Sequence, residues 1–302
     1  MGGVTETRQA APPHPAAPGP AGDGAVGDGA VGDGAPRRPA LSPSRAADFK
    51  QCPLLYRLRA IDRLPEAPTP AQVRGTLVHA VLDRLYALPA AERVPAAARA
   101  LVAPVGAELC AADPELAAVL PAVLTTAPDG HAEVDRLLDA YFALEDPRLL
   151  EPEAREQLVE VERESGVPLR GYVDRVDSLA GGGYRLVDYK TGAAPGPAHE
   201  GRALFQMKFY ALVLLLLRGR APRELHLLYL NGPLALRFTP DEEQLRRFGR
   251  TLDALWAAIR AAGATGEFRP NPGPLCASCT HRVRCPAWDG VPPPYPGWPE
   301  PG

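Results

Sequence analysis

The stretch GYVDRVDSLAGGGYRLVDYKTG, residues 171–192, decides the fold of this chain. Residues 171–179 and 184–190 are rich in β-branched and aromatic side chains, and each stretch is typical of a β-strand. The glycines at 181–183 between them readily adopt the positive φ angles of a tight turn. The sequence therefore predicts a β-hairpin here.

Acidic and basic side chains occupy defined positions in this predicted hairpin. Period-two alternation places Asp188 and Lys190 on the same face of the second strand. A turn centred on Gly181 sets Asp174 opposite Asp188. Opposed carboxylates repel each other unless a cation lies between them, and oxygen ligands suit Mg²⁺ or Mn²⁺. The alternative is an exposed hairpin whose charged side chains are only solvated.

Composition limits the rest of the chain. Residues 1–40 are rich in Ala, Pro and Gly and contain a repeated GDGAV unit, which predicts a disordered arm. We see no signal peptide, and the longest apolar run, 211–217, is too short to cross a membrane. We therefore expect a soluble, cytoplasmic protein with one domain over residues 41–290 and a Pro-rich tail at 291–302.

The charged residues argue against a protein that coats nucleic acid by bulk electrostatics, because the net charge is −3. Arginine clusters at 57–63, 246–250 and 282–284 are equally consistent with solvated helix faces. Among the 33 basic residues only Lys50, Lys190 and Lys208 are lysines. A lysine retained in so arginine-rich a chain suggests a role for its compact ammonium group.

Periodicity predicts a mixed α/β sheet flanked by helices. We expect strands at 157–164, 171–179, 184–190, 224–230 and 234–238. We expect helices at about 42–60, 70–88, 201–218 and 241–262, and a helical insertion over residues 89–155. The second of these helices carries His79 one turn before Asp83.

Five cysteines indicate a metal or cluster site, because disulfides are rare in the cytosol. Cys276, Cys279 and Cys285 lie within residues 276–286, and Cys52 is a suitable fourth ligand because it shares a Cys-Pro step with Cys285. Cys110 is then a core thiol. The alternative is a zinc knuckle in which His281 joins the three C-terminal cysteines. Spacing does not distinguish zinc from iron–sulfur.

Six segments occur in an order that resembles the RecB-like branch of the PD-(D/E)XK nuclease superfamily. Within that branch the resemblance is to the iron–sulfur-clasped group, which includes nuclease domains of recombination helicase-nucleases and CRISPR-associated adaptation nucleases. The match covers residues 41–288. The segments are LSPSRAADFKQCPLLY (41–56), RGTLVHAVLDRLY (74–86), GYVDRVD (171–177), VDYKTG (187–192), FQMKFYALVL (205–214) and CASCTHRVRCP (276–286).

The resemblance implies a restriction-endonuclease-like fold and a role for each matching residue. His79, Asp174 and Asp188 match the metal ligands, and Lys190 matches the lysine that orients or activates the attacking water. Gln206 and Tyr210 match the Q-x-x-x-Y unit that faces DNA. The [4Fe–4S] ligands correspond to Cys52, Cys276, Cys279 and Cys285.

Two positions depart from the family pattern. Asp188 stands where many members carry Glu. The acid sometimes found on the preceding strand has no unique match, because Glu160 and Glu162 share one face of the predicted strand.

The implied activity is hydrolysis of DNA phosphodiesters with Mg²⁺ or Mn²⁺, by an exonuclease that acts on single-stranded DNA in repair or recombination. A helicase is a possible partner by the same resemblance. A non-catalytic DNA-binding or scaffold module of a helicase complex is the main alternative. An RNA-processing or restriction-type enzyme on the same fold is a third reading, because a fold does not define a substrate.

Overall fold

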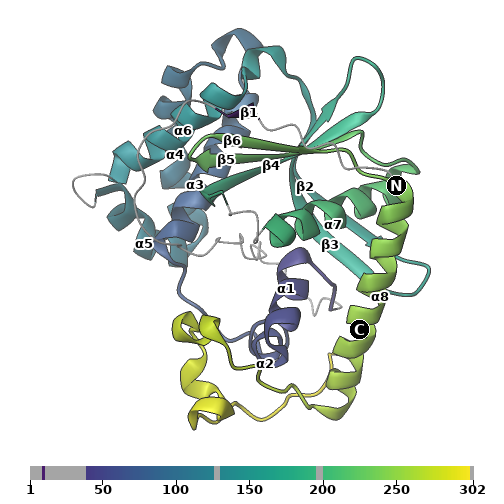
Figure 1. Cartoon of the computed structure of the whole chain (residues 1–302). Helices are drawn as coiled ribbons and strands as arrows, with labels where there is room; N and C mark the ends of the chain where they lie inside the picture. The colour runs from purple at the N-terminus through teal and green to yellow at the C-terminus, as the bar shows by residue number, and fades with distance from the viewer. Residues whose placement is uncertain (1–8, 11–38, 126–129, 195–199, 300–302) are drawn as a thin grey trace. The chain divides into compact units, whose positions relative to one another are not determined.

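The computed structural model describes residues 9–10, 39–125, 130–194 and 200–299 (Figure 1). The chain divides into two compact units. The described part of the first unit holds residues 9–10, 67–159 and 172–241, and that of the second holds residues 39–66, 160–171 and 242–299. Most of the predicted arm, residues 1–40, lies outside the described residues.

A six-stranded sheet with the order β1-β6-β5-β4-β3-β2 forms the centre of the fold. Strands β4 and β5 are parallel, whereas β4 pairs antiparallel with β3 and β5 pairs antiparallel with β6. The predicted mixed sheet is therefore confirmed. The strands are β1 (Gln9–Ala10), β2 (Pro152–Glu162), β3 (Pro168–Ser178), β4 (Tyr184–Ala193), β5 (Glu224–Asn231) and β6 (Leu234–Phe238).

The β3–β4 hairpin has the register that the glycine turn predicts. Arg175 pairs with Val187, so the turn is centred on Gly181. Gly182 and Gly183 have φ angles of 76° and 85°, a conformation that glycine adopts without steric cost. The regular ladder ends at this pair, one residue short of the two predicted acids.

Helices of the first unit cover both faces of the sheet. They are α3 (Pro70–Tyr86), α4 (Pro95–Ala112), α5 (Pro114–Thr125), α6 (Gly130–Leu144) and α7 (Glu200–Arg218). Helices α3 to α6 share one hydrophobic core with residues of β4, β5 and β6 such as Val187 and Leu228. Helix α7 connects the parallel strands β4 and β5, and residues on its buried face such as Met207 and Phe209 are fully enclosed.

The insertion expected at 89–155 is helical as far as α6, but its last residues already belong to β2, which begins at Pro152. Charged side chains at residues 153, 155 and 156 hide the alternation of apolar and polar residues at the start of that strand. The predicted start at residue 157 was therefore too late.

In the second unit, the helix expected over residues 42–60 is interrupted. Helix α1 (Pro43–Gln51) ends at Cys52, whose φ of −160° and ψ of 111° are extended, and α2 (Pro53–Tyr56) continues into a π-helical turn, η1 (Arg57–Ile61). Proline disfavours helical backbone in the residue before it, which explains the break. The break turns Cys52 out of the helix.

Helix α8 (Glu242–Thr265) and an ordered C-terminal segment complete the second unit. The Tyr295 hydroxyl donates to the Gly263 carbonyl at 2.7 Å, and Trp298 contacts Trp256 edge to face. The described part of the Pro-rich tail therefore packs along α8. No helix within the described ranges has both the length and the apolar character needed to cross a membrane.

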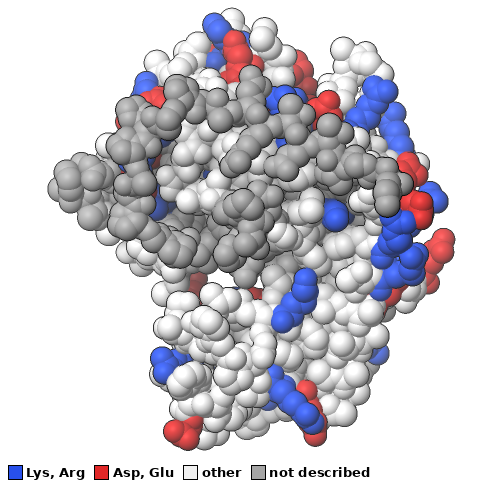
Figure 2. All heavy atoms as spheres, viewed as in Figure 1, with Lys and Arg blue, Asp and Glu red and all other residues white. Residues whose placement is uncertain are grey.

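Arginines of α8 pair with acids of the same helix. Arg246 lies 3.3 Å from Glu242, and Arg247 pairs with Glu243, each one turn earlier. Figure 2 shows basic and acidic side chains next to one another along this part of the surface. This cluster is accordingly a solvated helix face.

Candidate active site

Helix α3 is positioned so that His79 faces the end of β4. Thr69 caps the helix, accepting from the backbone N–H of Gln72 at 3.3 Å, and the Gln72 side chain accepts from the Thr69 N–H at 2.8 Å. A side chain at Gly75 would come within 2.9 Å of Thr191 Oγ1. Glycine at this position therefore permits the close approach of α3 to β4.

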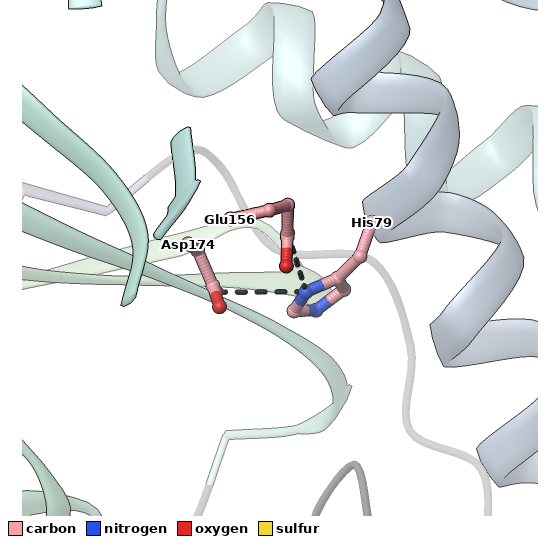
Figure 3. A group of neighbouring side chains, drawn as sticks. All are labelled: His79, Glu156 and Asp174. Atoms are coloured by element: carbon pink, nitrogen blue, oxygen red, sulfur yellow. Dashed lines mark ion pairs between the residues drawn. The ribbon is translucent and has the colours of Figure 1, made fainter. Parts of the chain in front are cut away.

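The ring of His79 lies between a backbone carbonyl and two carboxylates. Its Nε2 is 3.1 Å from the carbonyl oxygen of Tyr189, and a carbonyl can only accept a hydrogen bond. Nε2 is therefore the donor. Nδ1 faces Asp174 Oδ2 at 3.6 Å and Glu156 Oε1 at 3.8 Å (Figure 3). When the ring is neutral, Nδ1 presents a lone pair to the same space as these two acids.

His79, Glu156 and Asp174 form a candidate metal centre. Their ligand atoms all lie within 4.8 Å of one another. Their side chains are 13%, 37% and 11% exposed, so the group is enclosed but accessible from the side of Glu156. One imidazole nitrogen with two carboxylates is a donor set suited to Mn²⁺ or Mg²⁺.

Asp174 is oriented by the strand beside it. Its Oδ2 accepts the backbone N–H of Tyr189 at 2.7 Å. The last backbone pair of the β3–β4 ladder is Arg175 with Val187. Beyond that pair, the side chain of Asp174 accepts the backbone N–H of Tyr189. Both backbone groups of Tyr189 therefore contact residues of the candidate metal centre.

Lys190, Asp188 and Gln206 form a second group of contacts. The ammonium of Lys190 lies 2.7 Å from Asp188 Oδ2 and donates to Gln206 Oε1 at 2.8 Å. The amide nitrogen of Gln206 donates to Asp188 Oδ1 at 3.1 Å. Strand β4 supplies the first two residues and α7 supplies the third. The predicted proximity of Asp188 and Lys190 is thereby observed, and Gln206 adds a partner that alternation along the strand does not show.

The surroundings of the site raise the pKa values of one histidine and two aspartates. Burial alone would lower the pKa of His79, but the carboxylates of Asp174 and Glu156 raise it to about 9. Burial raises the pKa of Asp188 to about 6 against the opposing effect of Lys190. Burial likewise raises the pKa of Asp174. At His79 the proton therefore offsets the charge of nearby carboxylates, which a bound cation would also offset.

Glu156 is the residue that sequence reasoning missed. Its φ of 41° lies in the left-handed region, which is uncommon for a residue with a side chain. The strand was predicted to begin at residue 157, so Glu156 lay outside it, whereas the observed strand β2 begins at Pro152. The only signal in the sequence is an acid on the strand before GYVDRVD.

Tyr210 lies one turn after Gln206 on α7 but is only 7% exposed. Its ring contacts Phe209 edge to face, with centroids 6.0 Å apart. The four-residue spacing predicts that Gln206 and Tyr210 share one face of the helix. In the structure most of the Tyr210 side chain on that face is buried. The predicted contact of both residues with DNA stays a prediction.

Within the second unit, the four predicted cluster cysteines line one cavity of about 260 Å³, together with His281 and Trp288. The backbone N–H of Asn271 donates to Cys52 Sγ at 3.4 Å, and that of Gly273 donates to Cys276 Sγ at 3.3 Å. Over the described ranges, no three of these sulfurs come within 4.8 Å of one another, so a closed ligand cluster is not formed. Cys52, Cys276, Cys279 and Cys285 share the lining of this cavity with apolar residues such as Leu54 and Leu58.

His281 and Cys110 occupy different positions from these four. Nε2 of His281 lies 2.6 Å from Glu66 Oε1, and Glu66 also accepts from Thr280 at 2.9 Å and from Arg59 at 2.8 Å. The ring of His281 is therefore engaged by a carboxylate. Cys110 packs against the helical core of the first unit, as a core thiol does.

The fold and the site together define a class of protein. A mixed sheet flanked by helices, with a His/carboxylate group next to an acid-paired lysine, is a restriction-endonuclease-like fold with a candidate divalent-metal centre. The sequence profile of the PD-(D/E)XK nuclease superfamily matches residues 40–286, and the chain belongs to this superfamily. Membership implies phosphodiester hydrolysis on a nucleic acid with a divalent metal ion.

Comparison with solved structures supports the same fold. The chain is similar to the crystal structure of a "Putative exonuclease" from Eubacterium rectale, with a TM-score of 0.54 and 13% sequence identity. The alignment covers 80% of this chain and 88% of that chain. At this identity the likeness shows the fold alone. No curated protein matches this chain.

Proposed function

We propose that this protein is a RecB-like exonuclease that hydrolyses single-stranded DNA in repair or recombination. The observation that carries the proposal is the group His79, Glu156 and Asp174 beside the Lys190–Asp188 pair. A surface that only bound DNA would not need to concentrate carboxylates, because they repel phosphate. Their presence favours catalysis over the scaffold alternative.

The residues of the site fit a divalent ion. His79 Nδ1 and the carboxylates of Glu156 and Asp174 would hold it, and we keep Asp188 as a further ligand in the proposal. When bound, the metal ion polarises a phosphoryl oxygen and lowers the pKa of a water molecule. The His/carboxylate donor set favours Mn²⁺ and also accommodates Mg²⁺.

Lys190 is proposed to orient the attacking water and to offset negative charge on the phosphoryl group. Asp188 and Gln206 hold its ammonium at 2.7 Å and 2.8 Å, so the cation is placed before substrate arrives. Such preorganised charge costs no rearrangement during the reaction. Gln206 and Tyr210 are proposed to face DNA on α7, and a helicase is proposed as a partner on the basis of the family resemblance.

The test is a time course on end-labelled single-stranded, duplex and circular DNA with Mn²⁺ or Mg²⁺. We expect degradation of linear single strands from their ends. Lys190→Ala and Asp174→Ala should each lower the rate by at least about 100-fold without unfolding the protein. Arg246→Ala is the control, because it removes an exposed cation of α8 that pairs with Glu242. Full activity in both active-site variants, or none in the wild type with either metal, refutes the proposal.

We further propose that the cysteine cavity of the second unit holds a [4Fe–4S] cluster. Zn–S bonds of about 2.3 Å bring the sulfurs of a tetrahedral site to about 3.8 Å from one another. Among the described residues no three of the four sulfurs lie within 4.8 Å of one another, which is a wider arrangement than a tetrahedral zinc site requires. The engagement of His281 by Glu66 also argues against the zinc knuckle.

Anaerobic purification tests this second proposal. The wild type should show visible absorbance, and Cys279→Ser should bleach it and lower the melting temperature. Cys110→Ser is the control and should retain the colour. A colourless wild type that holds stoichiometric zinc would establish the knuckle instead.

A further inference from the structure

A single buried guanidinium reaches three tyrosine hydroxyls beside the candidate metal centre. Arg175 is fully buried, and its Nη1 donates to the hydroxyls of Tyr86 and Tyr189 at 2.7 Å each and to that of Tyr141 at 3.4 Å. The hydroxyls of Tyr86 and Tyr141 are 2.5 Å apart. Arg175 therefore joins three aromatic side chains through one cation.

Charge within this network is balanced. Arg175 also contacts Glu145 at 2.7 Å and Asp177 at 2.9 Å, and Arg185 lies 2.6 Å from Asp177. Two cations thus meet two carboxylates. Burial raises the pKa of Tyr86 to about 12, so its hydroxyl stays neutral and accepts from the guanidinium. The network is complete without an external ion.

Three members of the network come from the elements that carry the site. Arg175 directly follows Asp174 on β3. Tyr189 lies between Asp188 and Lys190 on β4. Tyr86 follows His79 on the same helix, α3. In contrast, Tyr141 belongs to α6, which contributes no residue to the site.

The backbone of Tyr189 connects this network to the metal ligands. Its N–H donates to Asp174 Oδ2 at 2.7 Å, and its carbonyl accepts from His79 Nε2 at 3.1 Å. Its ring also meets the ring of His79 edge to face, with centroids 5.7 Å apart. A displacement of Tyr189 would therefore reorient both ligands at once.

We propose that Arg175 and Tyr189 are positioning residues for the metal centre. The guanidinium holds the Tyr189 hydroxyl, and the Tyr189 backbone thereby holds His79 and Asp174 in ligating geometry. Neither side chain touches metal or DNA. This inference rests on the proposed function, because it assumes that these residues bind a metal ion.

Tyr189→Phe is the most direct test, because it removes one hydroxyl and keeps the ring against His79. Arg175 itself is a poor choice, since its loss would leave buried carboxylates without their partner. Tyr141→Phe is the matched control. It also removes a buried hydroxyl from the network, with a similar expected loss of stability, but on a helix without site residues.

The primary measurement is Mn²⁺ binding to metal-free, full-length protein by titration calorimetry, without DNA. We expect Tyr189→Phe to weaken Mn²⁺ binding about tenfold, the low end of what loss of a ligand's supporting contact costs. Tyr141→Phe should bind Mn²⁺ as the wild type does. In cleavage assays Tyr189→Phe should need more Mn²⁺ for half-maximal rate, with an unchanged KM for DNA.

The outcomes separate this inference from the proposed function. Equal Mn²⁺ affinity of Tyr189→Phe and the wild type overturns the positioning role and leaves the nuclease proposal intact. Equal loss in Tyr189→Phe and Tyr141→Phe also overturns it, because the effect is then general destabilisation. A wild type that binds no Mn²⁺ at all overturns both.

Discussion

Metal binding should displace a proton from His79, and the affinity should depend steeply on pH. The pKa of this imidazole is raised to about 9 by Asp174 and Glu156, although burial alone would lower it. At pH 7 only about 1% of the metal-free protein then has a neutral ring, which reduces metal affinity about 100-fold, or by about 2.7 kcal/mol. Asp188, with a pKa of about 6, is already ionised there.

Mn²⁺ affinity should therefore rise about tenfold per pH unit from 7 to 9 and level off above 9. Calorimetry at pH 7 in buffers of different ionisation enthalpy should report about one proton released per ion bound. The control is His131→Gln on α6, which should leave the slope unchanged. An affinity that does not change between pH 7 and 9, with no proton released, would refute the reasoning.

The same protonation predicts the stability of the metal-free protein. A histidine whose pKa is raised by folding stabilises the native state fully below its unfolded pKa of about 6.5. This contribution, about 3 kcal/mol, is lost as pH rises through about 9. Protein treated with a chelator should therefore melt at a lower temperature at pH 9.5 than at pH 7, and saturating Mn²⁺ should reverse the trend. A melting temperature that stays constant over this range would contradict the raised pKa.

Three further changes test other parts of the structure. Glu156→Gln should weaken Mn²⁺ binding and shift the pH dependence of affinity to lower pH, because one carboxylate that raises the His79 pKa is lost; an unchanged pH profile would exclude Glu156 from the site. Thr191 Oγ1 obstructs the methyl group that Gly75→Ala would add. In a double-mutant cycle, the effect of Gly75→Ala on the free energy of unfolding should therefore be more favourable by up to about 1 kcal/mol when Thr191→Ala is also present. Glu66→Gln should cost about 2 kcal/mol in urea unfolding, because three donors lose a charged acceptor; a variant as stable as the wild type would show that this carboxylate does not hold the cysteine segment.

Local patterns predicted much of the fold because their physical cause is local. The glycine turn and period-two alternation located the β3–β4 hairpin and its register, and the strand β6 was predicted with its observed bounds. Helix α7 was predicted to within one residue at each end. The break at Cys52 was not predicted, although the following proline is a sufficient local cause.

The candidate site was only partly predictable. Alternation along one strand brought Asp188 and Lys190 together without any knowledge of the fold. The contact between His79 and Asp174 depends on α3 packing against β4, which Gly75 permits but does not by itself indicate. The role of His79 therefore came from the family resemblance.

By itself, the sequence determined that the two strands of the hairpin carry Asp174 and Asp188, that Lys190 shares a face with Asp188, and which superfamily the chain resembles, because these properties depend on spacing along the chain. Only the tertiary structure decided that Glu156 joins the centre, that Gln206 bridges Lys190 and Asp188, and that Tyr210 is mostly buried. These outcomes depend on a positive φ angle and on the packing of elements distant in sequence. The φ angle and the packing are both set by long-range contacts, so they leave no periodic signal in the sequence.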